Sequence, residues 1–219
     1  MGLRPCITHA WNLSPAAAQE LQRRLARSVR FEVPAQMETV GGLDVSVRGE
    51  QGRAAVVVWH VGRQQVLESL VVEGYVSFPY VPGLLSFREV PLLMEALARL
   101  RTIPDVLMVD GQGLAHPRRC GLATHLGVLF DHPALGVAKS RLVGKHDAPA
   151  PEKGSWAPLY DNGEEIGAVV RTRTGVRPVY VSVGHRITLE EAIALTLRCT
   201  TRYRLPEPTR LADQLSRKT

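Results

Sequence analysis

Three runs of apolar and β-branched residues follow one another along the chain, at Val40–Arg48, Arg53–Val61 and Gln64–Glu73. The short stretches "GEQG" and "GR" separate them, and glycine-containing turns of this length are typical of β-hairpins. The pattern therefore predicts an antiparallel meander of three strands.

Helical spacing precedes and follows the meander. Ser14 and Pro15 suit the N-cap and first residue of a helix, and apolar residues then recur at helical spacing, which predicts a helix over about 14–30. A second helix is predicted over about 86–101. The motif "TLEE", in which Thr188 and Glu191 form a capping box, predicts the start of the last clear helix.

The segments "DVLMVDG" and "ALGVAKS" are short uninterrupted apolar runs, typical of buried central strands, and the helical stretch "GLATHLGVLFDHP" lies between them. A Pro- and Gly-rich loop, 145–156, is followed by strands at "EIGAVVRT" and "PVYVSV" and by a short helix in "RLPEPTRLADQL". This order predicts an α/β fold with a mixed central sheet, three antiparallel strands and then parallel ones, and helices on both faces. The first and fourth strands are expected to lie side by side and parallel. We expect one domain over 1–219, with the N-terminal helix and a core from about 38.

Composition narrows the class further. A chain that is 45% hydrophobic and 22% charged is ordinary for a globular protein, and it has no apolar run of the ~18–20 residues that a membrane span needs. The N-terminus lacks the apolar region of a secretory signal, and three widely spaced cysteines form neither a zinc pattern nor a disulfide framework. We therefore expect a cytoplasmic protein with no membrane partner. The formal charge of +6 favours a polyanionic partner.

Two aspartates lie at positions where an ionised carboxylate would be energetically costly. Asp44 is in the middle of the first predicted strand, and Asp110 ends the most apolar strand of the chain. A carboxylate in such a place is stable when it is paired or coordinates a metal, and Mg²⁺ prefers such oxygen ligands. Either Asp alone is more simply explained as a strand-end residue that bonds turn amides. Both together, with a nearby Glu, favour a metal site.

Glu89 has two competing interpretations. In "SFRE", Ser86 and Glu89 match the S-x-x-E pattern of a capping box at a helix start. A Glu folded back onto the backbone would be badly placed to bind a metal. Spacing alone favours the cap.

The stretch "DGQGLAHPRRCGLATHLG" follows a central strand, at the edge where open α/β sheets bind ligands. Gly111 and Gly113 permit close approach of a ligand, and the pair Arg118 and Arg119 precedes a helix, where phosphate could meet guanidinium groups and free amides. Lys139 ends the next strand and is expected at the same edge, where it could contact phosphate or position water. An ordinary loop and a solvated strand end are the simpler alternatives.

Taken in order, these segments closely resemble the endonuclease V family, inosine-directed repair nucleases with an RNase H-like fold. The resembling segments run from about residue 40 onward and are "GGLDVSV", "PYVPGLLSFRE", "VDGQGLAHPRRCGLATHLGV", "LGVAKSRLVG", "VSVGH" and "RLPEPTRLAD".

The resemblance implies roles for individual residues. Asp44, Glu89 and Asp110 match the metal-binding acids of the family, Asp213 matches a further position that holds His or Asp in relatives, and His116 and Lys139 match residues of phosphate contact and catalysis. Pro79, Tyr80, Val81 and Pro82 match a wedge that enters the duplex beside the lesion. A pocket for the extruded base is implied at Gly83, Leu85, Gly111, Gly113 and Leu142, and Gln112 stands where many relatives have His.

The activity implied is Mg²⁺-dependent hydrolysis, with Mn²⁺ as a substitute, of the second phosphodiester bond 3′ to a deoxyinosine, which leaves a 3′-hydroxyl nick. The implied partner is inosine-containing nucleic acid, DNA rather than RNA, bound by a monomer. Three alternatives stay open: an inosine-specific endoribonuclease, another RNase H-like nuclease that recognises nucleic-acid structure, and a non-catalytic nucleic-acid-binding protein.

Overall fold

The computed structural model describes residues 2–218, and Met1 and Thr219, the ends of the expected single domain, lie outside the described residues. Its helices are α1 (Pro15–Ala26), α2 (Leu85–Arg99), α3 (Leu122–Phe130), α4 (Leu189–Arg198) and α5 (Glu207–Arg217). Its strands are β1 (Thr39–Arg48), β2 (Gln51–His60), β3 (Gln65–Tyr75), β4 (Val106–Val109), β5 (Ala134–Ala138), β6 (Trp156–Asp161), β7 (Glu164–Val170) and β8 (Val179–His185).

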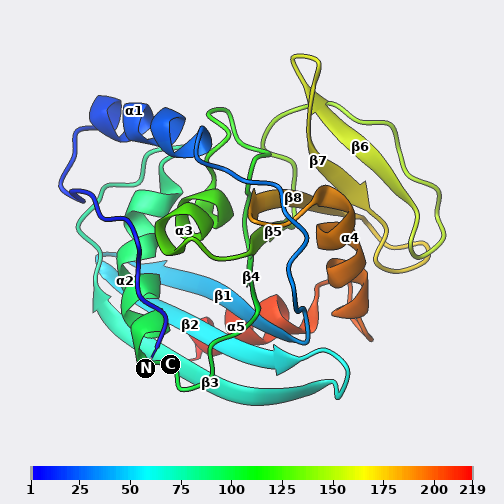
Figure 1. Cartoon of the computed structure of the whole chain (residues 1–219), viewed down its shortest axis with the longest axis horizontal. Coiled ribbons are helices and arrows are strands. Elements are labelled where there is room, and N and C mark those ends of the chain that lie inside the picture. Colours follow the sequence, from blue (N-terminus) through cyan, green and yellow to red (C-terminus); the bar gives the residue numbers. More distant parts are fainter. Residues whose placement is uncertain (1, 219) are drawn as a thin grey trace.

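All eight strands form one mixed sheet in the order β3-β2-β1-β4-β5-β8-β7-β6 (Figure 1). The predicted meander is confirmed, since β1 pairs antiparallel with β2 and β2 with β3. The parallel pairing of β1 with β4, expected from the sequence, is also confirmed, and β4 pairs parallel with β5. These pairings bring the carboxyl ends of three central strands to one edge.

Helices cover both faces of this sheet. Side chains of β4 alternate between the two cores: Leu107 and Val109 pack in the core beneath α2 and α3, whereas Val106 and Met108 pack in the core that includes residues of α4. α1 contacts α3, and α5 lies across β1 and β2 (Figure 1). The α/β class with helices on both faces is therefore confirmed.

α5 packs unusually close to β1. A Cβ atom placed on Gly42 would lie 2.1 Å from the backbone carbon of Pro208, the second residue of α5, so only glycine leaves room for the helix at this point. The close approach positions the rest of α5 over β1, and it is the reason that Asp213 reaches the edge of the sheet where Asp44 lies.

One strand was missed by the sequence analysis. β6 occupies Trp156–Asp161, where a loop that ends at Trp156 was expected. Pro158 obscures the strand pattern, yet β6 is the last strand of the sheet, and proline is tolerated there because an edge strand leaves some N–H positions unpaired. In Figure 1 the β6–β7 hairpin projects away from the rest of the sheet.

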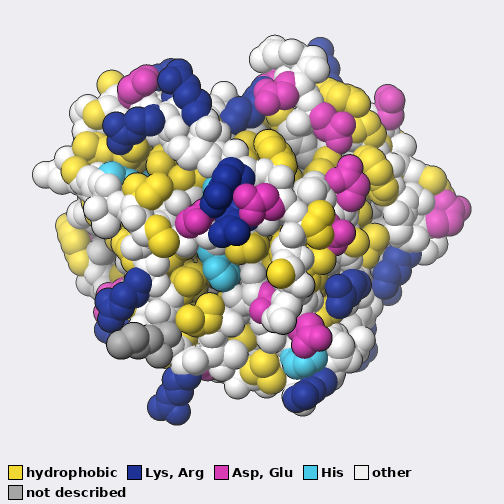
Figure 2. Space-filling model, viewed as in Figure 1, with side chains coloured by type: hydrophobic (Ala, Val, Ile, Leu, Met, Phe, Trp, Pro, Cys, Tyr) yellow, Lys and Arg dark blue, Asp and Glu magenta, His cyan; other side chains and the backbone are white. Residues whose placement is uncertain are grey.

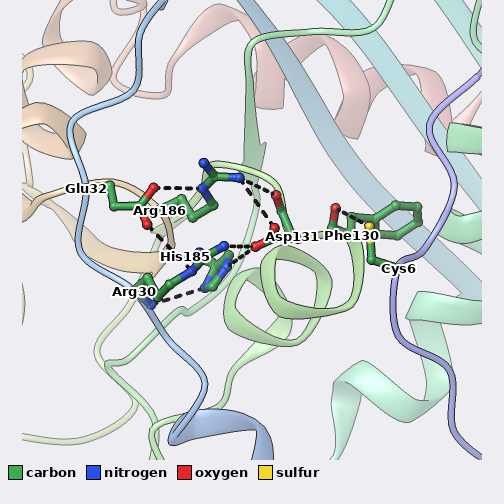
Figure 3. A network of polar contacts seen from close by, with 7 residues as sticks. All are labelled: Cys6, Arg30, Glu32, Phe130, Asp131, His185 and Arg186. Carbon is green, nitrogen blue, oxygen red and sulfur yellow. Dashed lines mark hydrogen bonds and ion pairs between the residues drawn. The ribbon is translucent and has the colours of Figure 1, made fainter.

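The segment after α1 is held by a cluster of charged residues, here called the Asp131 network. Its members are Arg30, Glu32, Asp131, His185 and Arg186 (Figure 3). The Arg30 N–H donates to Nδ1 of His185 (3.3 Å) and the Arg186 N–H donates to the Arg30 carbonyl (2.7 Å), so the chain is tied to the end of β8. The N-terminal helix ends at Ala26, earlier than the predicted boundary near 30.

Among the described helices none is long and apolar enough to cross a membrane. On the face shown in Figure 2, basic and acidic side chains are interspersed, and a compact group of both signs lies near its middle. The formal charge of +6 is therefore not gathered into one basic patch on this face.

Candidate metal and nucleic-acid site

Three of the predicted acids meet at the carboxyl-end edge of the sheet. Asp44 is in β1, Asp110 directly follows β4, and Asp213 is in α5; one carboxylate oxygen from each lies within 4.8 Å of the others. The parallel register that pairs Leu43 with Val109 places the two strand residues side by side. Three converging carboxylates are a donor set that suits a hard divalent cation.

Cationic and hydroxyl groups surround this acid cluster. Nζ of Lys139 donates to Asp110 Oδ2 (2.5 Å) and to Asp213 Oδ1 (2.9 Å). Ser216, one turn after Asp213 in α5, donates its hydroxyl to Asp44 Oδ2 (2.5 Å). Lys139 therefore lies at this edge, as its position at the end of β5 predicted, and it pairs with two of the acids.

The electrostatic balance of the cluster disfavours ionised carboxylates. Burial raises the pKa of Asp44; the hydrogen bond from Ser216 opposes this shift, and the charges of Asp110 and Asp213 add to it. Burial likewise raises the pKa of Asp110, although the hydrogen bond from Lys139 opposes this shift. A divalent cation would offset these costs, because it is the charge that the site lacks. The residues present thus fit a bound Mg²⁺.

Glu89 lies close enough to interact with these acids but outside the group of converging oxygens. Its side chain is 8% exposed, and burial together with the charges of Asp44 and Asp110 raises its pKa to about 8. Direct coordination of a metal by Glu89 stays a prediction. The coupling to two acids of the cluster supports it.

The capping box expected from "SFRE" is wrong. α2 begins at Leu85 after the N-cap residue Leu84, and no side chain caps this end of the helix. Ser86 instead shares a hydrogen bond with Nδ1 of His125 in α3 (2.8 Å). Glu89 is consequently free of the backbone role that spacing alone favoured.

A cavity of about 380 Å³ opens beside the acid cluster. Gly83, Leu85, Gly111 and Leu142, four of the residues expected around an extruded base, line it. Asp110 and Lys139 line it too, so the cavity and the acid cluster share two side chains.

Gly113 is not among the residues that line this cavity, and its assignment to the base pocket stays a prediction. A Cβ atom at Gly113 would lie 2.0 Å from the carbonyl oxygen of Val183, and its N–H donates to the Ser182 hydroxyl (2.8 Å). The lack of a side chain at this position serves close packing of the loop against β8. Its neighbour Gln112 does line the cavity and donates to the Ser140 carbonyl (3.0 Å).

The loop before α2 is fixed by three donors that converge on one carbonyl. The Gly83 oxygen accepts from Gln22 Nε2 (3.0 Å), His116 Nε2 (3.0 Å) and Arg118 Nη2 (2.8 Å). Gly83 has φ +77°, and a Cβ atom there would lie 2.6 Å from Arg118 Nη2, so glycine is required at this turn. The wall of the cavity is thereby held in one conformation by α1 and by the 116–118 loop.

His116 serves this loop rather than standing free at the site. Because the Gly83 carbonyl can only accept, Nε2 of His116 carries the proton, and Nδ1 accepts from the Arg118 N–H (3.2 Å). Burial, and then the charge of Arg118, lower the pKa of His116 to about 4, so the ring is neutral at physiological pH. Its predicted part in phosphate contact and catalysis stays a prediction.

The two consecutive arginines also have partners within the protein. Arg118 Nε donates to Gln22 Oε1 (2.6 Å). Arg119 pairs with Asp161 (3.0 Å) and Glu164 (2.7 Å), which tethers the β6–β7 hairpin. In the observed geometry both guanidinium groups bind other parts of the protein. Contact of either group with phosphate therefore stays a prediction.

The stretch Pro79–Pro82 projects into solvent beside the cavity. Tyr80 is 73% exposed, and Pro79 and Pro82 are exposed as well. Tyr80, Val81 and Pro82 also line the cavity. An exposed aromatic ring between prolines, next to a cavity, matches the geometry that a wedge requires.

Several contributors were not found from the sequence. Gln22 is a polar residue on the buried face of α1, and nothing in its helical context marks it. Ser216 follows Asp213 at the i, i+3 spacing of one helix face, a signal that could have been used. The Ser86–His125 contact joins two helices and carries no local signal.

The mixed sheet, with carboxylates gathered at the ends of β1 and β4 and supplied also by α5, defines an RNase H-like α/β protein with an acidic site. Comparison with known proteins agrees. The endonuclease V family profile matches residues 19–214. An endonuclease V of Roseiflexus sp. (strain RS-1) is 52% identical over 94% of this chain and 93% of its own length.

Solved structures give the same result. The crystal structure of the endonuclease V from Streptomyces avermitilis has a TM-score of 0.91 at 42% identity and covers 99% of this chain and 96% of that one. The Ciona intestinalis endonuclease V, in complex with a DNA that contains an inosine followed by a ribo-adenosine, has a TM-score of 0.82 at 27% identity, over 94% of this chain and 97% of that one. The chain belongs to the endonuclease V family, and it is a nuclease by that membership.

Proposed function

We propose that this protein is a Mg²⁺-dependent DNA repair endonuclease that recognises deoxyinosine and hydrolyses the second phosphodiester bond 3′ to it, leaving a 3′-hydroxyl. The observation that carries the proposal is the shared wall between the cavity and the acid cluster: Asp110 belongs to both, and Lys139, which hydrogen-bonds two acids of the cluster, also lines the cavity. A base held in the cavity would lie beside the groups that act on the backbone.

The cavity suits a flipped base. Its volume of about 380 Å³ falls within the ~300–1,000 Å³ typical of small-ligand sites. Extrusion of a base costs a few kcal/mol and least for a poorly paired base, as inosine is. Tyr80 would occupy the vacated position in the stack, because the flanking prolines fix its backbone and leave the ring exposed.

The acid cluster suits the hydrolytic step. Asp44, Asp110 and Asp213 would hold Mg²⁺ or Mn²⁺, with Glu89 close by. When bound, the cation supplies Lewis-acid polarisation of the phosphate and lowers the pKa of water. Lys139 is protonated there: burial lowers its pKa, but hydrogen bonds to Asp110 and Asp213 outweigh this effect and raise it. Its ammonium group can therefore contact the phosphate beside the acids.

The experiment that tests the proposal compares four substrates: matched oligonucleotide duplexes with and without one deoxyinosine, and inosine-containing and plain RNA. Each is incubated with Mg²⁺ and with a chelator. We expect Mg²⁺-dependent nicking of the deoxyinosine strand at the second bond 3′ to the lesion, faster than cleavage of the RNA. Faster cleavage of inosine RNA would replace the proposal with the endoribonuclease alternative.

The wedge has its own test. For Tyr80→Ala we expect about 10-fold weaker preference for deoxyinosine over undamaged duplex, in line with the ~1–3 kcal/mol of base stacking on an aromatic ring, while Mg²⁺ dependence is unchanged. Tyr203→Ala is the matched control, because that tyrosine is also exposed but lies outside the cavity. An unchanged preference in Tyr80→Ala would remove the wedge from the proposal.

A further inference from the structure

Behind the cavity lies a row of three side chains that the proposed mechanism does not use. Nε2 of His9 is 2.8 Å from Nε2 of His125, and Nδ1 of His125 is 2.8 Å from the Ser86 hydroxyl oxygen. Ser86 lines the cavity. The three residues come from the N-terminal segment, α3 and α2, so the fold brings together positions far apart in the sequence.

Aromatic packing fixes the central ring of this row. His125 is fully buried, with the Trp11 ring stacked on it (centroids 5.5 Å apart, 17° between planes) and the Phe87 ring edge-on (5.1 Å). The imidazole can therefore neither rotate freely nor exchange its partners with water.

Both histidines are neutral at physiological pH. Burial, and then the neighbouring His9, lower the pKa of His125 to about 3. Burial also lowers the pKa of His9, and its hydrogen bond to the Ala10 carbonyl does not fully offset this. Each ring thus carries one proton, on one of its two nitrogens.

The positions of these protons follow from the contacts. Nδ1 of His9 lies 2.9 Å from the Ala10 carbonyl oxygen, which can only accept, so the His9 proton is on Nδ1 and its Nε2 accepts. Nε2 of His125 must then donate to His9, which leaves Nδ1 of His125 as an acceptor. Ser86 consequently donates its one hydroxyl proton to His125.

Because the Ser86 hydroxyl already donates its proton to His125, it can only accept a hydrogen bond from any further partner. Within residues 2–218 the Ser86 hydroxyl has no other hydrogen-bond partner, and Ser86 is one of the residues that line the cavity. We propose that Ser86 is a specificity-determining residue, whose hydroxyl accepts a hydrogen bond from the ring N1–H of hypoxanthine, and that His125 and His9 are positioning residues that hold it as an acceptor. This inference rests on the proposed function.

The chemistry of purines gives this arrangement its selectivity. Hypoxanthine carries a hydrogen on N1, whereas adenine presents a lone pair there. A hydroxyl that can only accept would bond the N1–H of hypoxanthine. Against adenine, the same hydroxyl would face the N1 lone pair, and neither group would find a partner. The site would therefore discriminate both by attracting hypoxanthine and by leaving polar groups unpaired with adenine. This polarity is one of the features that distinguish the deaminated base from its parent.

The first experiment measures nicking of duplexes that carry deoxyinosine or purine 2′-deoxyriboside, a base with no 6-oxygen and no hydrogen on N1. For Ser86→Ala we expect the ratio of kcat/KM, deoxyinosine over purine deoxyriboside, to fall about 10-fold, the loss of one hydrogen bond. Ser69→Ala, an exposed serine on β3, is the matched control and should keep the wild-type ratio. A purely structural role of Ser86 would lower both rates together and leave the ratio unchanged.

The second experiment reverses the polarity without touching Ser86. His9→Phe keeps a ring against Trp11, whose centroid lies 4.2 Å from that of His9, but removes the acceptor for His125. The His125 proton is then expected on Nδ1, where it donates to Ser86, and the Ser86 hydroxyl becomes a donor toward the cavity. Long-range ¹H–¹⁵N spectra of the histidine rings should show this tautomer change, and nicking of the purine deoxyriboside duplex should rise relative to deoxyinosine.

The outcomes separate this inference from the function on which it rests. Wild-type protein that fails to nick deoxyinosine DNA would overturn both. Normal nicking with an unchanged ratio in Ser86→Ala would overturn the role of Ser86 alone. A wild-type spectrum with the His125 proton on Nδ1 would also overturn it.

Discussion

The acid cluster and the Asp131 network both combine carboxylates with basic side chains, but they differ in electrostatic balance. In the Asp131 network, the carboxylate accepts from His185 Nε2 (3.0 Å) and pairs with Arg30 and Arg186. The hydrogen bond from His185, followed by the contacts with Arg30, lowers the pKa of Asp131. In the acid cluster, burial and neighbouring carboxylates raise the pKa of Asp44, Asp110 and Glu89 instead.

This difference teaches how to separate a binding site from a structural network. Paired charges that satisfy one another hold segments together, as the Asp131 network holds the chain after α1 (Figure 3). Carboxylates with too little positive charge around them lower the stability of the folded protein. Such a loss of stability is typical of functional sites. Four experiments test this difference between the acid cluster and the Asp131 network.

The largest effect is expected from Asp110→Asn. Loss of an acid of the cluster should reduce Mg²⁺-dependent nicking of a deoxyinosine duplex by more than about 100-fold, the upper range for residues that merely support a metal ligand. Binding of the duplex, measured by fluorescence anisotropy, should change little. Asp147→Asn, on an exposed loop, is the matched control. Full activity of Asp110→Asn would contradict the assignment of the cluster.

The second prediction concerns the pH dependence of stability. With a pKa raised from 4.5 to about 8, folded Glu89 keeps a proton that the unfolded chain has already lost in this range. The metal-free protein should therefore lose stability as pH rises from 4.5 to about 8. Thermal unfolding in the presence of a chelator should show this slope, and Glu89→Gln should flatten it. An equal slope in both proteins would show that Glu89 is not the group that titrates.

A smaller loss is expected from Asp131→Asn. Asparagine tolerates the left-handed backbone at this position, φ 48°, so the substitution removes the charge and not the turn. We expect the free energy of unfolding at pH 7 to fall by about 1 kcal/mol, because the ion pairs are half-exposed and screened. Nicking per folded molecule should be unchanged. A loss of nicking would mean that the network acts on the site.

The smallest effect is expected from the same network at acid pH. The lowered pKa of Asp131 means that its stabilisation is present at neutral pH and is lost as pH falls through the acid range. Burial also lowers the pKa of His185, despite its bond to Asp131, so the unfolded chain takes up that proton first. Below pH 3.8, the ordinary pKa of an Asp, urea midpoints of the wild type should fall with decreasing pH, the opposite direction to the Glu89 effect at higher pH, and Asp131→Asn should weaken this trend.

The sequence predicted most of the fold because its strands and helices carry strong local patterns. The meander, the parallel pairing of β1 with β4 and the capped start of α4 at Thr188 were all found in this way. β6 was missed because Pro158 breaks the strand pattern, and an edge strand imposes weaker demands on sequence.

The site was predicted less completely, for a different reason. Asp44 was found as a carboxylate in the middle of a strand and Asp110 as one that ends a buried strand, and both signals are local. The partners that decide their chemistry come from far along the chain: Ser216 for Asp44, and His125 for Ser86. Spacing favoured a cap for Ser86 and Glu89, and tertiary contacts with α3 and the acid cluster outweighed it.

The close seating of α5 on Gly42 has a consequence for how activity arises during folding. Asp44 and Asp213 belong to β1 and α5, which are far apart in the sequence, and they meet only when α5 is docked on β1. Contacts of such long sequence separation form late. A partly folded chain therefore cannot assemble the three-acid centre, and the protein gains nuclease activity only once folding is complete.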